Sequence, residues 1–492
     1  MVVSLMKRQI ATLGAANLSE FAIQFLIPIV LTRILDPNGF GEYRLLWLVA
    51  STLLATLPMG ATSSLPYFLP RHDLNGQAVY VRQALIYLFM VGLVTGLALS
   101  PLNPLLPDAL ETMTREHFAV PMFLALWVFA SVLDILPNAE QRVEFQAGVI
   151  LSMAVLRVGA VIAGAVVGGI DAVVWGLTLV AATKVVLLLA ISSARYGRQL
   201  WLGRTFRVLE HAKYAIPVGA DNAVYLLRLQ ADQWLVVVLF GSTQYGVYSL
   251  GAVALALGSI VRATFNNVIF PEMSKAQAEG DIAKLLRLNN RSNVTVSLFV
   301  FPMLAYLFAA ASPFIRLVYT DAYADAIPVI RLNVIAFLVA VVEMSTVMLV
   351  LRQGPFLLGT SIFSLVAGLS ASYAGSQWWG LPGAVSGAIV GNFLAVSAVY
   401  ARASQLLGVP IRTLQDWRTI ACIGGAAIVA GLIAYASLVL IPPGLGYLLE
   451  ILVSGVVFCC VYALALIGFG QWRLVANILA SLPQLRRHLN RR

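Results

Sequence analysis

Long apolar runs alternate with short polar segments along nearly the whole chain. The runs are about 20 residues long, the length of a helix that crosses a bilayer, whereas barrel strands show segments of about ten residues with alternating polarity. Breaks at Gly, Pro and charged residues give fourteen predicted spans, centred near residues 23, 55, 91, 127, 157, 182, 226, 255, 300, 338, 364, 391, 430 and 457. The pattern predicts an all-α polytopic membrane protein with about 14 transmembrane helices.

The composition agrees with lipid as the solvent of this chain. Of its 492 residues, 60% are hydrophobic and 11% are charged, and the mean hydropathy is +0.87. A soluble protein of this length needs far more polar surface. In hydrocarbon every backbone N–H and C=O must be paired within the protein, which leaves helices and closed barrels as the spanning structures. Because the runs have helical length, we expect helices.

Basic residues are distributed unevenly between the predicted loops. If the N-terminus is cytoplasmic, most of the 32 Lys and Arg residues lie on the inner side. The predicted outer segments hold Arg33, Arg44, Arg115, Arg316 and Arg331. Since basic loops stay in the cytoplasm, both termini are predicted there, with the chain in the cell membrane. The formal net charge of +10 follows from this topology and from contacts with anionic lipid, and it does not indicate nucleic-acid binding.

The chain repeats itself at an offset of 205 residues. GAAN at 14–17 recurs as GADN at 219–222, FGEY at 40–43 as YGVY at 245–248, and Pro66 as Pro271. Gly, Asn, Tyr and Pro punctuate helices, so their matched placement indicates a duplicated bundle. Six predicted spans separate the two copies. The halves are therefore predicted to be parallel repeats with the same orientation in the membrane.

The repeat divides the chain into five predicted parts. An N-lobe of six spans covers residues 1–193, a cytoplasmic linker 194–213, and a C-lobe of six spans 214–405. Spans 13 and 14 occupy 406–470, and a basic cytoplasmic tail follows at 471–492. The expected fold is thus two six-helix parallel repeats plus two C-terminal helices. Gly383, Gly387 and Gly391 recur once per helical turn, which predicts close packing of neighbouring helices.

Charged side chains inside the spans are the first candidates for function, because they are costly in hydrocarbon. In span 7, Asp221, Tyr225, Arg228 and Asp232 follow a 4-3-4 spacing that places them on a single helix face, next to Asn222. Such a face lines a water-filled cavity or forms polar contacts between helices, with Arg228 and Asp232 neutralising each other. We favour the cavity.

The first span carries a matching polar face. Asn17, Glu20 and Gln24 have the same helical spacing, and Glu20 corresponds to Tyr225 under the repeat. Two repeats with polar faces at matching positions are expected to enclose one central chamber.

Arg157 and Lys184 are lone cations near the middle of spans 5 and 6, without an acidic partner on their own helices. A buried cation must be balanced by an acid from another helix, such as Glu20, or by an anionic group of a substrate. The sequence does not decide between these two alternatives.

Span 8 carries a further cation, Arg262, on one face with Ser259 and Asn266, and Glu343 in span 10 is the acid available in the second half. Near a helix end Arg262 lines the cavity or extends toward lipid headgroups. The candidates for binding substrate are Arg157, Lys184, Arg228, Arg262, Asn17, Asn222 and Tyr225. The candidates for coupling to a proton or a sodium ion are Glu20, Asp221, Asp232 and Glu343.

We find no signature of catalysis, cofactor or metal binding. The sequence contains no phosphate-binding loop, nucleophile elbow or His-Glu metal motif, and we expect a non-enzyme with no catalytic residues. Its four histidines are far apart and form no predicted metal cluster, and the three cysteines lie in late apolar segments. A membrane-embedded polymerase or ligase would need a longer outer loop than this chain offers.

Two segments resemble the signatures of polysaccharide exporters. RILDPNGFGEY at 33–43, predicted to close span 1, resembles the pattern R-x-L-x-P-x-x-F/Y-G-x-Y, and DQW at 232–234, YGVY at 245–248 and PEMS at 271–274 are similar to a second signature. The resemblance covers about residues 7–350. Together the two segments resemble those of flippases for lipid-linked oligosaccharides in the multidrug/oligosaccharidyl-lipid/polysaccharide exporter superfamily, whose drug exporters are the MATE transporters.

The resemblance implies a MATE-like two-lobed bundle around a cavity that opens alternately to each side of the membrane. The implied substrate is a polyprenyl-pyrophosphate-linked oligosaccharide for surface polysaccharide, either lipopolysaccharide or exopolysaccharide. The implied partners are membrane lipids, a coupling cation (proton or sodium), a polysaccharide polymerase and chain-length machinery. Arg157, Lys184, Arg228 and Arg262 would face the pyrophosphate or acidic sugars.

Two alternatives remain within the superfamily. A proton- or sodium-coupled multidrug exporter would want acids in its cavity, and the central cations argue against it. A lipid II flippase would also have fourteen spans and a cationic cavity, and this sequence does not separate it from an oligosaccharide flippase.

Overall fold

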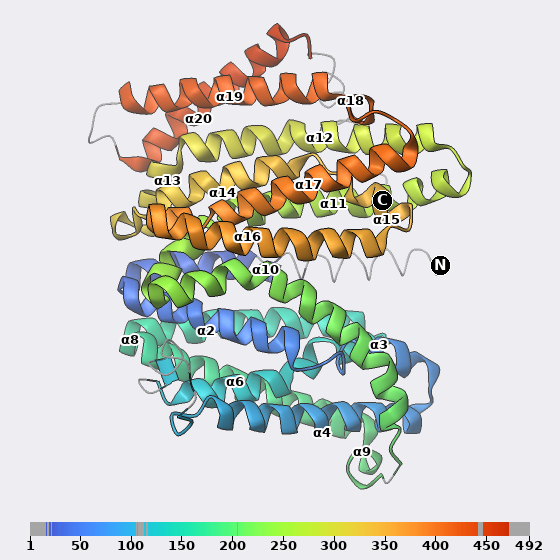
Figure 1. Ribbon diagram of the computed structural model, residues 1–492. Coiled ribbons are helices and arrows are strands. Elements are labelled where there is room, and N and C mark those ends of the chain that lie inside the picture. The colour runs from blue at the N-terminus through green and yellow to red at the C-terminus, as the bar shows by residue number, and fades with distance from the viewer. Residues whose placement is uncertain are drawn as a thin grey trace, which may run out of the picture. The chain divides into compact units, whose positions relative to one another are not determined.

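The computed structural model describes residues 16, 19–20, 22–104, 106, 113–114, 117–203, 205–440 and 446–471, and every regular element in these ranges is helical. Two compact units of similar size divide the chain, residues 1–246 and 247–492 (Figure 1). Asn17 and the basic tail after residue 471 lie outside the described residues.

The first unit begins with a short apolar helix, Ala22–Ile34. Its further elements, in chain order, are α2 (Pro37–Thr56), α3 (Leu65–Phe68), η1 (Leu69–Arg71), α4 (Leu74–Ala98), α6 (Ala119–Ala130), η2 (Ser131–Asp134), α7 (Leu136–Ala139), α8 (Val143–Tyr196), α9 (Arg198–Leu202) and α10 (Val208–Gly251), which continues into the second unit.

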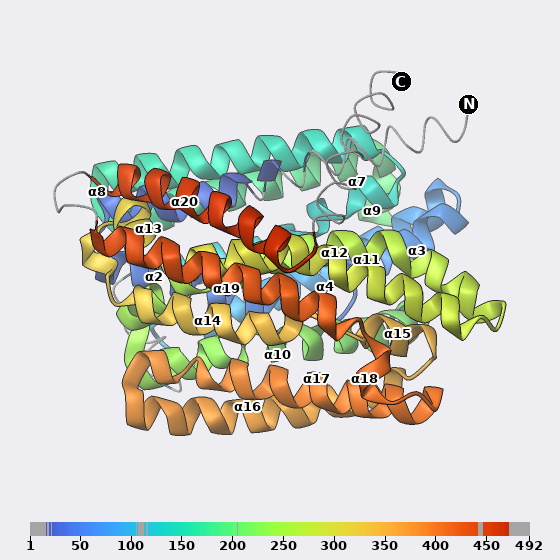
Figure 2. The ribbon, with the colours of Figure 1, turned by 90° about the horizontal axis from the view of Figure 1, so that it is seen from above.

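The second unit contains the remaining helices. They are α11 (Val253–Ala278), α12 (Ile282–Ala309), α13 (Ala311–Tyr319), η3 (Asp321–Tyr323), α14 (Ala326–Val341), α15 (Ser345–Val350), α16 (Gly354–Gly383), α17 (Ser386–Leu407), α18 (Ile411–Leu414), α19 (Trp417–Leu440) and α20 (Tyr447–Gly468). Within it α12, α19 and α20 pack in sequence, and α16 packs against α17 (Figure 2).

Eight helices within the described ranges are long and apolar enough to cross a membrane, and Ala22–Ile34 and Ala326–Val341 are shorter apolar helices. The chain is therefore a multi-pass membrane protein, as predicted. At 1.5 Å per residue the 54 residues of α8 would extend about 80 Å, far more than the ~30 Å of a hydrocarbon core. Non-helical torsion angles at Gly168 and Gly169 break it into two segments of spanning length. The count of fourteen spans stays a prediction.

The second predicted span, centred near residue 55, is misplaced. Its helix α2 begins at Pro37 and ends at Thr56. The Asp36 side chain accepts a hydrogen bond from the backbone N–H of Gly39 at 3.1 Å, and Pro37 occupies the first turn, so the polar motif at 33–43 starts a helix instead of only closing one. Hydropathy missed this start because the first turns of α2 carry polar residues.

Glycines set several close approaches between helices. A Cβ on Gly383 would lie 1.9 Å from the carbonyl oxygen of Gly375, and a Cβ on Gly387 would lie 2.2 Å from that of Gly368. The predicted role of this glycine series in close packing is confirmed.

The two copies of the repeated motif touch each other within the first unit. Thr243 Oγ1 donates a hydrogen bond of 2.8 Å to Asn38 Oδ1, and these residues are 205 positions apart. Gly41 and Gly246 have the same offset, and a Cβ on Gly246 would lie 2.9 Å from the Cα of Gly41. The start of α2 and the end of α10 are thus in direct contact, and α10, predicted to open the C-lobe, packs with the first unit up to Gly246.

Candidate functional site

Arg157, on the first half of α8, forms part of the wall of two neighbouring cavities in the first unit. One cavity has a volume of about 290 Å³ and the other about 230 Å³. The Arg157 side chain is buried, and its Nη2 lies 3.6 Å from Glu20 Oε1. Among the described residues neither Nε nor Nη2 of Arg157 has a hydrogen-bond partner. A buried guanidinium with unused donors is suited to an anionic oxygen from a ligand.

Lys184, on the second half of α8, lines the smaller cavity together with Arg157 and Glu20. Its Nζ lies 2.7 Å from Asp134 Oδ2. Lys184 is buried, whereas 52% of the Asp134 side chain is exposed. The cavity therefore holds two cations and two carboxylates in two pairs, one buried partner and one more accessible partner in each.

Two tryptophans lie between the two cations. The Arg157 guanidinium carbon is 5.4 Å from the ring centroid of Trp47, and Lys184 Nζ is 4.4 Å from that of Trp127. The two rings pack edge to face, with centroids 5.5 Å apart. Cations over aromatic faces gain electrostatic energy in addition to that from a carboxylate, so the tryptophans help to stabilise both charges.

The larger cavity has a different lining, with amide, hydroxyl and aromatic groups beside its cations. Besides Arg157 it is lined by Gln24, Ile27, Pro28, Tyr43, Arg44, Trp47, Leu48, Ser51, Gln233 and Tyr245. Tyr245 Oη donates to Gln233 Oε1 at 2.8 Å. Amides and hydroxyls can exchange hydrogen bonds with sugar hydroxyls, whereas the guanidinium groups match phosphate oxygens.

Side-chain hydrogen bonds fix α10 against α2 next to this cavity. Gln230 accepts from Thr52 Oγ1 at 2.7 Å and donates to Ser51 Oγ at 2.9 Å. Trp234 Nε1 donates to Thr52 Oγ1 at 2.9 Å. These bonds set the depth at which Gln233 and Tyr245 reach the cavity wall.

The polar face predicted on span 7 lies elsewhere. Asp221, Asn222 and Tyr225 are exposed on α10, and the Arg228 guanidinium carbon is 5.7 Å from the Tyr225 ring centroid. None of these four is among the residues that line the two cavities, and neither is the half-buried Asp232. The structure thus brings Arg157, Lys184 and Glu20 together at one cavity, and the span 7 residues are not among those that line it. Their functional roles remain predictions.

In the second unit Arg262 is buried beside the predicted acid Glu343. Arg262 Nη2 lies 3.0 Å from Glu343 Oε1, which also accepts from Asn266 Nδ2 at 2.7 Å and from Thr346 Oγ1 at 2.8 Å. Asn293 Nδ2 donates to the Glu343 backbone carbonyl at 2.9 Å. Glu343 lies in the break between α14 and α15, so these contacts also hold the chain in place where the helix is interrupted.

Sequence reasoning missed two residues that the structure places in charged contacts. Asp134, the partner of Lys184, was not named among the acids that could balance it from another helix. His117 was set aside as one of four scattered histidines, yet it lies between Glu42 and Asp171. The sequence did offer a signal for this contact: His117 lies just before a predicted span, and Glu42 and Asp171 lie near the same predicted side of the membrane.

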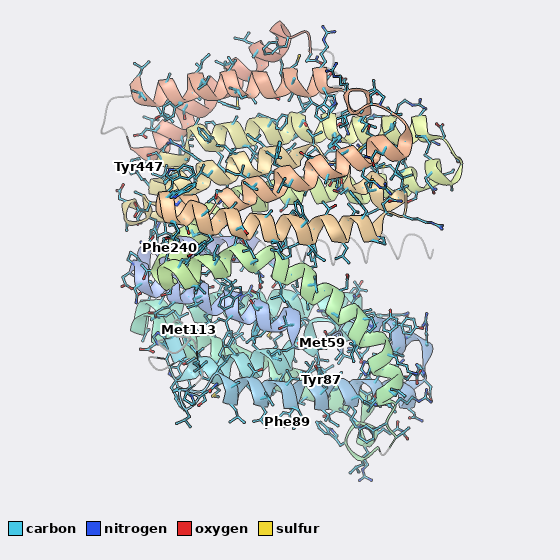
Figure 3. The ribbon with its side chains drawn as sticks, in the orientation of Figure 1. Met59, Tyr87, Phe89, Met113, Phe240 and Tyr447 are labelled. Atoms are coloured by element: carbon cyan, nitrogen blue, oxygen red, sulfur yellow. The ribbon has the colours of Figure 1, made fainter. Side chains whose placement is uncertain are left out.

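Two further cavities in the first unit are apolar. One of about 420 Å³ is lined by Met59, Tyr87 and Phe206 among others, and one of about 580 Å³ by Phe89, Phe129 and neighbouring aliphatic residues. Met59 and Tyr87 lie away from the end of the unit that carries Met113 and Phe240 (Figure 3). Cavities without charge fit hydrocarbon chains better than a sugar headgroup.

The helical bundle defines the class of protein, a multi-pass membrane protein with a MATE-like fold. The chain belongs to a family of polysaccharide biosynthesis proteins, whose sequence model matches residues 30–328. A search of the curated proteins found no match.

Several solved structures share the fold. The lipid II flippase MurJ in an inward closed conformation aligns with a TM-score of 0.64 at 10% identity, over 93% of this chain and 99% of that one. An inward-facing multidrug resistance MATE family transporter of the MOP superfamily aligns at 0.58 with 14% identity, over 78% and 94%. A MOP superfamily transporter from Pyrococcus furiosus, described as having reverse polarity of its binding pocket, aligns at 0.55 with 14% identity, over 82% and 96%. The predicted MATE-like fold is confirmed.

Proposed function

We propose that this protein is a flippase that moves a polyprenyl-pyrophosphate-linked oligosaccharide from the inner to the outer leaflet of the cell membrane, by alternating access, for the synthesis of surface polysaccharide. One observation carries the proposal: Arg157 forms a wall of two cavities and keeps buried guanidinium donors without hydrogen-bond partners among the described residues. Membership in a polysaccharide biosynthesis family supports the substrate class.

The chemistry of the two cavities fits the headgroup of such a lipid. A pyrophosphate is too costly to carry through hydrocarbon unpaired. Arg157 supplies a planar set of donors that matches phosphate oxygens, and Lys184 supplies a second cation in the same cavity. The sugar would lie against Trp47 and the Gln24, Ser51 and Gln233 side chains, while the polyprenyl chain stays in lipid.

Glu20 is a carboxylate that the substrate can replace as the partner of Arg157. It is 3.6 Å from Arg157 and accepts a hydrogen bond of 3.0 Å from Gln24. A pyrophosphate that binds Arg157 competes with this carboxylate, because both are anionic oxygen ligands for one guanidinium. Protonation of Glu20 would remove the competitor, so proton binding would favour substrate binding. Glu20 is our first candidate for coupling, followed by Asp221, Asp232 and Glu343, with proton and sodium both open.

The proposed topology has both termini in the cytoplasm. It places the turns at Asp36, Gly169 and Gly241 on the outer side. Reporter fusions after residues 36, 169 and 203 test this orientation, since the first two should report the outside and the third the cytoplasm.

Translocation in reconstituted vesicles tests the function. A labelled polyprenyl-pyrophosphate oligosaccharide is supplied in one leaflet, and its arrival in the other is followed by quenching. Arg157→Ala should slow translocation by about 10- to 100-fold, the effect of losing one charge-assisted contact of about 1.5–3 kcal/mol. Arg412→Ala, at an exposed arginine of the second unit, is the matched control and should transport normally. Equal rates in the two variants would contradict the proposal.

The same assay separates the alternative substrates. Lipid II carries a polyprenyl pyrophosphate too, so competition by lipid II at equal concentration would favour a lipid II flippase. Transport of cationic drugs at a rate that Arg157→Ala does not change would favour a drug exporter.

A further inference from the structure

His117 precedes α6 and is held between two carboxylates from two different helices. Its Nε2 lies 2.7 Å from Glu42 Oε2, on α2, and its Nδ1 contacts Asp171 Oδ1, just after the break in α8. The His117 side chain is 6% exposed, whereas that of Asp171 is 65% exposed. Each ring nitrogen therefore faces an acceptor oxygen in a largely buried setting.

The contacts continue from His117 to a fourth segment. The other carboxylate oxygen of Glu42, Oε1, accepts from Asn38 Nδ2 at 2.7 Å, and Asn38 Oδ1 accepts from Thr243 Oγ1 at 2.8 Å. Thr243 follows Gly241, where α10 is broken by a positive φ of 79°. The chain of contacts thus links the start of α2, the segment before α6, the break in α8 and the break in α10, all at one end of the first unit. We call this set of residues the His117 latch.

The geometry selects the protonated ring. A neutral imidazole has one N–H donor and one acceptor nitrogen, whereas an imidazolium has two donors. Only the imidazolium can donate to Glu42 and Asp171 at once. The hydrogen bond to Glu42 and the nearby Asp171 carboxylate, against the opposing effect of burial, raise the pKa of His117 to about 9.

We propose that the His117 latch is a proton-binding site that ties α8 to α2 when His117 is protonated and releases α8 when the proton is lost. None of the coupling acids considered from the sequence belongs to it. Its contribution to transport rests on the proposed function, in which this end of the unit must open to the outside, but the latch itself does not.

Of the two contacts of His117, with Glu42 and with Asp171, the weaker one breaks when the proton is lost. A neutral His117 can keep one donor on one carboxylate, and the other carboxylate then faces a nitrogen lone pair. Glu42 is buried and held by Asn38. Asp171 is exposed and can turn to water at little cost. Loss of the proton therefore frees Asp171, and with it the turn between the two halves of α8.

The elements around the ring carry few other charged residues in the described part of the chain. α6 carries no charged residue, and neither does the segment 235–246 around the break in α10. On the α2 side Asp36 caps the helix at Gly39, and Arg44 lines the larger cavity. Glu42 and Asp171 are the two carboxylates in contact with the ring.

The direction of the pH effect follows from the raised pKa. The stabilisation is complete below the pKa of the released state, in which His117 still contacts Glu42, and it is lost as the pH rises through about 9. Because the Glu42 contact is present in both states, only the part of the raised pKa that comes from Asp171 separates the tied from the released state. Screening at the exposed Asp171 reduces this part further, so we expect the equilibrium between the two states to change by up to about tenfold.

Distances between spin labels test the latch in the purified full-length protein, without substrate. Labels at Ile34 and Val167 report on the start of α2 and the turn of α8, after replacement of Cys422, Cys459 and Cys460, in nanodiscs of uncharged phosphatidylcholine. At pH 6 we expect one narrow distance distribution. Toward pH 9.5 a second, longer population should appear, with a midpoint between about 6.5 and 9.

Three variants complete the experiment. Asp171→Asn removes an exposed charge with little risk to folding and should show the longer population at all pH values, as should His117→Gln. His72→Gln alters a histidine that contacts the Phe68 carbonyl and should behave as the parent. A distance distribution that does not change with pH in the parent protein would overturn the latch. So would a pH response that is unchanged in Asp171→Asn and His117→Gln. Failure of the flippase assay alone would leave the pH response intact, which separates the two proposals.

Discussion

Lys184 Nζ lies 2.7 Å from Asp134 Oδ2, although 50 residues separate them along the chain. The cation is buried and the acid is half-exposed, so the pair has one member that water cannot solvate. Asp134→Ala would leave Lys184 unpaired in the wall of the smaller cavity. We expect a loss of about 1–3 kcal/mol in the free energy of unfolding, measured by thermal or denaturant unfolding in detergent.

The matched double variant separates structure from function. Asp134→Ala with Lys184→Met removes both charges, and most of the lost stability should return because no buried charge is left without a partner. Translocation should stay impaired, since the second cation of the cavity is gone. A double variant that is both stable and fully active would show that Lys184 serves packing alone.

Trp47 bridges Arg157 and Trp127, so its removal should affect the substrate more than the fold. Trp47→Leu keeps an apolar side chain but removes the aromatic face near Arg157. We expect a rise in the apparent KM for the oligosaccharide lipid of about 3- to 30-fold, from about 0.5–2 kcal/mol of lost cation–π and stacking energy. Trp378→Leu, at a tryptophan that is 77% exposed, is the control and should leave KM unchanged. An equal effect in both variants would count against a role of Trp47 in the site.

Gly41 is where the two motif copies meet, and any side chain there should be harmful. A Cβ on Gly41 would lie 2.4 Å from the Ser242 carbonyl oxygen. Gly41→Ala should lower the free energy of unfolding by about 1–3 kcal/mol, because the backbone of α10 must move away. A Cβ on Gly159 would have no neighbouring atom within 4 Å. Gly159→Ala should therefore leave the free energy of unfolding unchanged or raise it by up to about 1 kcal/mol. Melting temperatures compare the two, and a Gly41→Ala protein as stable as Gly159→Ala contradicts the contact.

Glu20→Gln should mimic permanent protonation of the coupling candidate. Without the carboxylate 3.6 Å away, Arg157 is free for the pyrophosphate. We expect tighter substrate binding, by about 3- to 10-fold, together with transport that no longer responds to a proton gradient. Binding is measured by titration and coupling by imposing a gradient across vesicles. Gradient-dependent transport in Glu20→Gln would move the coupling role to Asp221, Asp232 or Glu343.

Much of the fold was predictable because the bilayer allows so few backbone structures. Apolar runs of helical length and glycines spaced one turn apart led to a helical bundle with close helix contacts, and both are present. The second span was misplaced because the capped first turn of α2, at Asp36 and Pro37, is polar and invisible to hydropathy. The packing of α10 with the first unit up to Gly246 arises from contacts such as Asn38–Thr243, which lie far apart in sequence.

The site was predictable only in part. Arg157 was expected to be balanced either by an acid from another helix, with Glu20 as the named candidate, or by an anionic substrate group, and Glu20 lies within salt-bridge distance of it. The partner of Lys184 was not foreseen, since Asp134 reaches it only through the packing of two helical segments. His117 escaped notice because its meaning depends on two carboxylates brought together by folding. Periodicity shows which face of a helix is polar, but not which other helix that face meets.

Equilibrium binding tests whether Arg157 holds the pyrophosphate. The purified protein is titrated with a polyprenyl pyrophosphate and with the uncharged polyprenyl alcohol of equal length, in parallel with Arg157→Ala. We expect the parent to bind the pyrophosphate at least about tenfold more tightly than the alcohol, and Arg157→Ala to lose this difference. Equal affinity for the two lipids in the parent, or a preference that persists in Arg157→Ala, would contradict it.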